Sequence, residues 1–190
     1  MQPSSPATVC WMPFWNEEHP GVGLEHLVLS AHRADSVMLG IDADAGPFRL
    51  FYQLAWDSGW FLLAADLRLE TTSGARALSL RTDGMGHWRL GDGTPRPDLD
   101  GCIDIDIWPT PFTNSFPIRR ESLPVGERRT FRMAWVSALE MSVKAQSQAY
   151  TRLQEGVYRF ESLDGSGFKA DLRVDGDGLV VEYPGLFKRV

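Results

Sequence analysis

Short segments in which apolar and polar residues alternate run through most of the sequence and restrict the chain to β structure. In the clearest segment, Ile103, Ile105 and Ile107 alternate with Asp104 and Asp106. Because successive side chains of a strand point to opposite faces, the isoleucines share one face and the aspartates share the other. Similar segments lie at 36–41, 48–54, 60–70, 76–82, 130–136, 157–161, 168–174 and 179–183.

Glycine and aspartate mark turns between these segments, as in Asp57-Ser58-Gly59 and Asp83-Gly84. Many short strands at this spacing predict an antiparallel all-β barrel, roll or sandwich. Residues 138–153 lack Gly and Pro and are long enough for a helix, but their apolar residues recur at every second position. That period favours a strand there as well.

The length of 190 residues predicts a single domain, 1–190, in which about 1–14 form an irregular N-terminal arm. A weak internal repeat relates roughly 48–90 to 144–183, since Leu80-Arg81-Thr82-Asp83-Gly84 resembles Leu172-Arg173-Val174-Asp175-Gly176. Either the chain contains two pseudo-repeated lobes, or Leu-Arg-x-Asp-Gly is a common hairpin signal used twice.

Charge and composition exclude several classes of protein. The net charge of −6 is opposite in sign to that of a general nucleic-acid binder. Two cysteines are too few for a disulfide scaffold or a structural zinc site. The first ten residues do not resemble a signal peptide, and no run of about 18 apolar residues could span a membrane. We therefore expect a cytoplasmic protein in a reduced compartment, with no nucleic-acid partner.

Acidic and histidine side chains give a candidate polar site, which comprises Glu25, His26, Asp104 and Asp106. Paired carboxylates could hold a hard cation or divide acid and base roles. The alternative is a solvated or hydrogen-bonded strand face, for which Arg119 and Arg120 offer structural partners. The histidines lack metal-ligand spacing, and no nucleophile elbow or phosphate loop is present. The sequence therefore predicts no catalytic residue, no metal and no cofactor.

Residues 110–120 form the most unusual segment, because Pro111 and Pro117 prevent a regular central strand and predict a stiffened loop. A loop with hydroxyl, amide and guanidinium groups suits a polar head group next to an apolar body. Seven Trp and ten Phe could either fill the core or line a cavity for such a body. The candidate ligand-binding residues are Trp60, Trp88, Phe112, Thr113, Asn114, Arg119 and Arg120.

Four segments carry a resemblance to a known family: GLEHL at 23–27, LDGCIDID at 99–106, TPFTN at 110–114 followed by PIRR at 117–120, and GLVVEYPGLF at 178–187. Over about 15–189 the chain resembles the bacterial Putative glycolipid-binding family. The resemblance implies a spiral β-roll, likened to carrier lipoproteins that hold lipid or glycolipid. The resemblance implies no catalytic residues. We expect no export signal in this sequence, and in this respect it differs from those carriers.

Three functions remain open from the sequence. The first is a non-enzymatic lipid- or glycolipid-binding protein with an apolar, aromatic-lined cavity, and an amphiphilic small molecule as its partner. The second is a hydrolase or isomerase that acts on a sugar-like substrate through Asp104, Asp106 and a histidine such as His26. The third is a β-rich interaction module without a cavity. The residues favour the first over an enzyme, and they indicate no oligomeric state.

Overall fold

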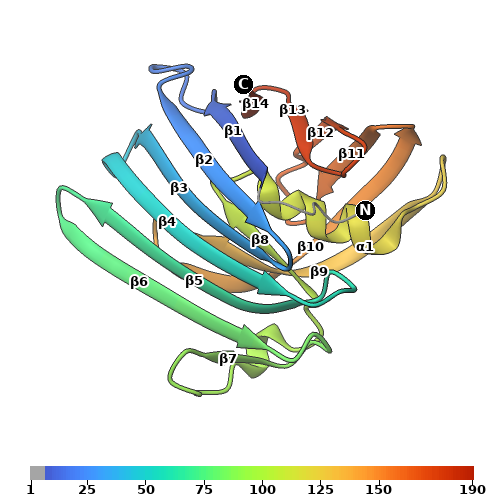
Figure 1. The fold of residues 1–190 in the computed structure, drawn as a ribbon, viewed down its shortest axis with the longest axis horizontal. Coiled ribbons are helices and arrows are strands. Elements are labelled where there is room, and N and C mark those ends of the chain that lie inside the picture. The colour runs from blue at the N-terminus through green and yellow to red at the C-terminus, as the bar shows by residue number, and fades with distance from the viewer. Residues whose placement is uncertain (1–6) are drawn as a thin grey trace.

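Strands that follow one another along the chain also lie next to one another in a single sheet (Figure 1). The computed structural model describes residues 7–190, and its 14 strands have the order β7-β6-β5-β4-β3-β2-β1-β14-β13-β12-β11-β10-β9-β8. The strands are β1 Ala7–Pro13, β2 Gly23–Ser30, β3 Arg33–Asp42, β4 Gly46–Trp56, β5 Leu62–Thr71, β6 Gly74–Thr82, β7 Trp88–Leu90, β8 Asp104–Trp108, β9 Arg128–Ser137, β10 Ser142–Gln154, β11 Val157–Ser162, β12 Lys169–Val174, β13 Val180–Tyr183 and β14 Phe187–Arg189. The helical segments are η1 Pro97–Leu99, η2 Phe112–Asn114 and α1 Ser115–Glu121.

Strand β1 lies in the middle of the sheet, where it pairs with β2 on one side and β14 on the other. Its Trp11 is fully buried and donates a hydrogen bond from Nε1 to the carbonyl of Val180 at 2.7 Å. Every strand pair is antiparallel except β8 with β9, which is parallel. The predicted fold class, an all-β antiparallel spiral roll or open barrel of many short strands, is confirmed; the strands form one large open sheet that does not close into a barrel.

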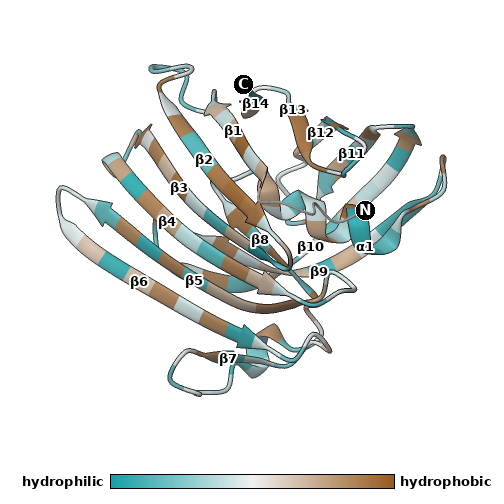
Figure 2. Cartoon of the chain, in the orientation of Figure 1, coloured by the Kyte–Doolittle hydropathy of each residue, from teal (hydrophilic) through white to brown (hydrophobic). Residues whose placement is uncertain are grey.

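The alternation in the sequence places one face of each strand in the core. Along β4, the buried residues are Phe48, Leu50, Tyr52, Leu54 and Trp56, and the residues between them are more exposed. Figure 2 shows the same alternation as bands of contrasting hydropathy along the strands. The alternating segments predicted as strands all fall on strands, and residues 138–153 supply most of β10.

The N-terminal arm differs from the prediction. Residues 1–6 lie outside the described part of the chain, but Ala7–Pro13 forms β1 instead of an irregular segment. Pairing with β2 and β14 holds this segment extended, and its burial alternates like that of the other strands. The two stretches of the weak repeat each form a meander, β4 to β7 and β10 to β13; duplication itself stays a prediction.

Residues 112–121 also differ from the prediction, since they form η2 and α1 where a loop was expected. Pro117 is the third residue of α1, and proline is tolerated in a first turn because the amides there have no partner within the helix. The helix ends at Ser122, whose backbone is left-handed with φ of 45°. Ser115, Phe116, Pro117 and Ile118 are buried, so α1 packs inside the curled sheet (Figure 1).

The two edges of the sheet approach each other through the segments next to β7 and β8. The amide of Gly101 donates to the carbonyl of Gly86 at 3.0 Å, and Trp88 Nε1 donates to the carbonyl of Cys102 at 2.7 Å. Gly86 has φ of +96°, and a Cβ placed there would lie 3.1 Å from the Cα of Gly101. Glycine is therefore required for both its backbone angle and the close approach.

Replacing Gly86 with alanine is expected to lower the free energy of unfolding by about 1–3 kcal/mol more than the same change at Gly93. Gly93 has a similar φ of +91°, but a Cβ added there would meet no atom within 4 Å, so Gly93→Ala reports the backbone strain alone. Urea denaturation of both variants measures the difference. Equal losses would show that the contact with Gly101 is not restrictive.

Candidate functional site

A partly open pocket of about 330 Å³ lies where strands from the second half of the sheet meet the chain between β8 and α1. Six aromatic side chains form much of its wall: Trp108, Trp135, Phe160, Phe168, Tyr183 and Phe187. The polar lining is contributed by Asp106, Thr110, Asn114, Gln146, Gln148, Ser162, Asp164 and Ser166. The lipid-binding hypothesis and the enzyme hypothesis both require such a pocket, whereas the interaction-module hypothesis does not.

The aromatic wall is built from rings that support one another. Phe160 contacts both Phe168 and Tyr183, with ring centroids 6.0 and 6.2 Å apart. Phe187 lies 6.4 Å from Tyr183 and 6.2 Å from Trp108. These tilted and edge-on arrangements are the favourable ones for aromatic pairs. The wall therefore presents fixed apolar surfaces to whatever occupies the pocket.

The polar floor is centred on Asp106, one of the residues singled out in the sequence. Thr113 Oγ1 donates to Asp106 Oδ1 at 3.2 Å, and Gln148 Nε2 donates to Asp106 Oδ2. Burial raises the pKa of Asp106, and these two hydrogen bonds oppose the rise. Within residues 7–190, Gln148 Oε1 is buried without a hydrogen-bond partner. An acceptor of this kind is costly unless something donates to it.

Two further lining groups already have partners. Asn114 Oδ1 accepts a hydrogen bond from the Tyr150 hydroxyl at 2.8 Å, and Asn114 Nδ2 donates to the carbonyl of Pro111 at 3.2 Å. Thr110 Oγ1 accepts from the amide of Phe112 at 3.1 Å and donates to Glu25 at 2.9 Å. The Thr110 hydroxyl proton and one N–H of the Asn114 amide are therefore used inside the protein.

Behind Thr110 lies a fully buried carboxyl group, that of Glu25 on β2. Ser36 Oγ donates to its Oε1 at 3.0 Å, and the Tyr52 hydroxyl donates to the same atom. Oε2 is buried and has no partner within the described chain. Burial raises the pKa of Glu25 to about 7, although the hydrogen bonds from Tyr52, Thr110 and Ser36 lower it.

Comparison with known proteins identifies the family. The model of the family described as Putative glycolipid-binding matches residues 12–189. The chain belongs to this family. It is also similar to a DUF1089 family protein from Pseudomonas aeruginosa known from a crystal structure, with 46% sequence identity and a TM-score of 0.87 over 90% of this chain and 94% of that chain. A search of curated proteins gives no match.

The family model thus confirms the resemblance to the Putative glycolipid-binding family that the four sequence segments indicated. No helix in residues 7–190 is both long and apolar enough to cross a membrane. The same part of the chain contains no group of three or more His, Cys, Asp or Glu side chains placed to hold a metal ion.

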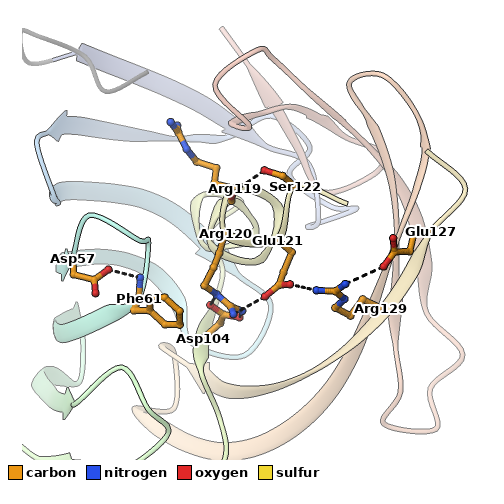
Figure 3. A network of polar contacts seen from close by, with 9 residues as sticks. All are labelled: Asp57, Phe61, Asp104, Arg119, Arg120, Glu121, Ser122, Glu127 and Arg129. Carbon is orange, nitrogen blue, oxygen red and sulfur yellow. Dashed lines mark hydrogen bonds and ion pairs between the residues drawn. The ribbon is translucent and has the colours of Figure 1, made fainter. Parts of the chain in front are cut away.

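Asp104 and Arg120 form a buried ion pair between β8 and α1, drawn in Figure 3. Their side chains are 1% and 11% exposed, respectively. Arg120 also contacts Glu121 at 2.7 Å, and Glu121 in turn contacts Arg129. Burial raises the pKa of Asp104 to about 6, although Arg120 lowers it. On the aspartate face of β8, Asp104 is thus paired inside the protein, whereas Asp106 is hydrogen-bonded and faces the pocket.

Other predicted site residues lie elsewhere. Trp60 and Arg119 line a second, more polar pocket of about 650 Å³, in which the Arg119 guanidinium lies 4.2 Å from the centre of a Trp60 ring. Arg119 projects from α1 away from Arg120 (Figure 3). Phe112 and Trp88 are buried in the core, and His26 is exposed on β2. The assignment of these residues to a ligand stays a prediction.

The structure brings Asp106, Thr113 and Asn114 together at the aromatic pocket, but most of its lining was not anticipated. Gln148 and the rings of Trp108, Trp135 and Phe160 come from strands that the sequence alone cannot place side by side. A weak signal was present in Gln146 and Gln148, two amides at alternate positions of a predicted strand. They share one face, although neither spacing nor residue type indicated what that face contacts.

Substitution of Glu25 with glutamine should remove a pH dependence of stability. A folded-state pKa near 7, above the ordinary value of 4.5, gives stabilisation that is complete below about pH 4.5 and is lost as the pH rises through 7. Relative to wild type, Glu25→Gln should therefore gain up to about 3 kcal/mol in free energy of unfolding between pH 4.5 and pH 8. Denaturant titrations across this range measure the gain, and a stability profile of Glu25→Gln parallel to that of the wild type would contradict it.

Loss of the Arg120 guanidinium should leave the Asp104 carboxylate buried without its ionic partner. We expect Arg120→Ala to lower the free energy of unfolding by about 3–5 kcal/mol at pH 8, where Asp104 is ionised. Arg129→Ala, at the exposed end of the same network, should cost much less. Chemical denaturation compares the two variants, and similar losses would mean that the buried pair contributes no more than the exposed one.

Proposed function

We propose that the protein is a non-enzymatic binding protein that takes the sugar-like head group of an amphiphile, such as a glycolipid, in the aromatic pocket. Membership of the Putative glycolipid-binding family supports an amphiphilic ligand. The observation that carries the assignment to this pocket is the pairing of aromatic walls with Gln148 Oε1, a buried acceptor that no described group satisfies.

A sugar ring matches both features of the pocket. Its C–H faces are apolar and stack on aromatic rings, and its hydroxyl groups donate to acceptors at its edge. Binding sites for small molecules combine mainly apolar walls with a few polar groups that fix orientation. Here Gln148 Oε1 would accept a ligand hydroxyl, and Asp106 would accept another while Thr113 and Gln148 hold its carboxylate in place.

The size of the pocket suits a head group and not a complete lipid. About 330 Å³ is at the lower end of the ~300–1,000 Å³ range of small-molecule sites. Leu163 and Phe168, in the loop between β11 and β12, are 43% and 39% exposed. Phe168 also lines the pocket, so an acyl chain leaving it would run over this apolar rim. We therefore place the head inside and the tail outside.

The arrangement gives less support to hydrolysis or isomerisation by Asp104, Asp106 and a histidine. Asp104 is held by Arg120, and His26 is exposed on β2. Of the three, Asp106 alone lines the pocket. A mechanism that divides acid and base roles among Asp104, Asp106 and a histidine needs at least two of them within reach of the same bound molecule.

Binding of n-octyl β-D-glucoside below its critical micelle concentration tests the proposal, with the fluorescence of Trp108 and Trp135 as the signal. Gln148→Met removes both the buried acceptor and the donor to Asp106 while keeping a side chain of similar length, and should weaken binding about tenfold, the equivalent of about 1.4 kcal/mol. Gln154→Met is the matched control on the same strand, because Gln154 is exposed and distant from the pocket lining.

Two results would contradict the proposal: no saturable binding of the glucoside by the wild-type protein, or equal affinity of the wild type and Gln148→Met. Native mass spectrometry of the purified protein, followed by organic extraction, provides an independent readout. We expect a released species that contains both a glycosyl group and an acyl chain.

A further inference from the structure

The charged side chains in the lining of the aromatic pocket are all of one sign, and Lys144, which lies against the Trp135 ring, is not part of that lining. Its lining includes two carboxyl groups, those of Asp106 and Asp164, and none of its lining residues is Lys, Arg or His. Asp164 lies at the rim, where Ser166 holds the pKa of its carboxyl at about 2 through hydrogen bonds. A ligand entering this pocket therefore meets negative charge and no protein cation in the lining.

The floor carboxylate lacks a counterion, in contrast to a neighbour on the same strand. Asp104, two residues earlier on β8, has Arg120 against it. Asp106 has only the neutral donors Thr113 and Gln148, and no cationic side chain within residues 7–190 forms an ion pair with it. Buried charges in proteins are ordinarily paired. Asp104 therefore has a cationic partner within the protein, whereas Asp106 faces the pocket without one.

The aromatic wall adds a second attraction for positive charge. The faces of Trp, Tyr and Phe rings attract cations, most strongly where water is excluded. One ring of this wall already contacts an ammonium, since Lys144 Nζ lies 4.9 Å from the centre of a Trp135 ring. A carboxylate among aromatic rings, with the unpartnered Gln148 Oε1 next to it, is a site for a group that donates protons and carries positive charge.

We propose that the head group bound in this pocket carries an ammonium, as in an amino sugar or another amine-bearing amphiphile. The amine donates to Asp106 and to Gln148 Oε1, and the aromatic rings pack against the apolar part of the head group around the amine. This inference rests on the proposed function and narrows its ligand class. It disfavours head groups whose charge is a phosphate, sulfate or carboxylate, because these would meet Asp106 and Asp164 in the lining, where no cationic side chain lies.

Three octyl glycosides that differ at one position test the inference: n-octyl β-D-glucoside, its 2-amino-2-deoxy analogue and the N-acetyl form of that analogue. Isothermal titration calorimetry at low salt measures each affinity. We expect the wild-type protein to bind the amine at least about tenfold more tightly than either neutral compound. The preference should decline with added salt and disappear at a pH where the amine is deprotonated.

Two variants assign the preference to the pocket carboxylate. Asp106→Asn keeps the shape and should bring the three affinities to within about twofold of one another, with the amine losing most. Asp171→Asn, at an exposed carboxylate paired with Arg159 on the outside of the protein, should retain the wild-type preference. If Asp106→Asn does not fold, the salt and pH series on the wild type still test whether the preference depends on the charge of the amine.

The outcomes separate the two proposals. If the wild type binds all three glycosides equally, the ammonium is excluded and a neutral sugar site remains. If none of the three binds, the proposed function itself fails. A preference that survives Asp106→Asn would place the cation elsewhere and overturn the assignment.

Discussion

The ion pair between Asp104 and Arg120 fixes the part of the molecule on which the pocket depends. It ties α1 to β8 inside the sheet, so the short connection between them has little freedom. Thr110, Thr113 and Asn114 all lie in that connection, and their hydrogen bonds extend to Glu25, Asp106 and Tyr150, respectively. A stretch of chain a few residues long therefore connects elements from both halves of the sheet, and the floor of the pocket is positioned as a consequence.

Glu25, Asp104 and Asp106, two buried carboxyl groups and one half-buried, show how surroundings distinguish chemically similar side chains. Asp104 has a cation, Glu25 has three hydroxyl donors, and Asp106 has an amide and a hydroxyl beside a pocket. Burial raises the pKa of each carboxyl, and a different set of partners opposes that rise in each case. The first therefore serves to hold α1, the second links stability to pH, and the third faces the ligand-sized space.

Local pattern was sufficient to predict the strands but not their surroundings. Alternation of Ile103, Ile105 and Ile107 identifies β8, since side-chain direction in a strand depends only on position. Whether Asp104 and Asp106 face water depends on α1. Pro111 and Pro117 argue against a helix there, because the sequence alone does not distinguish a proline in the first turn of a helix from a proline in a loop. Gln148 could not be assigned to the pocket, because its neighbours there come from β8, β11 and β13.

The pairing of β1 with β14 has a consequence for how the molecule forms. Most neighbouring strands are connected by short turns and can pair as soon as they leave the ribosome, but β1 must wait for the strand made after all the others. Contacts between such distant segments slow folding, because a long loop has to close before they can form. Until then β1 exposes one unpaired edge, the kind of edge at which chains associate with one another. Pairing of β14 with β1 therefore covers the edge at which the new chain could associate with another.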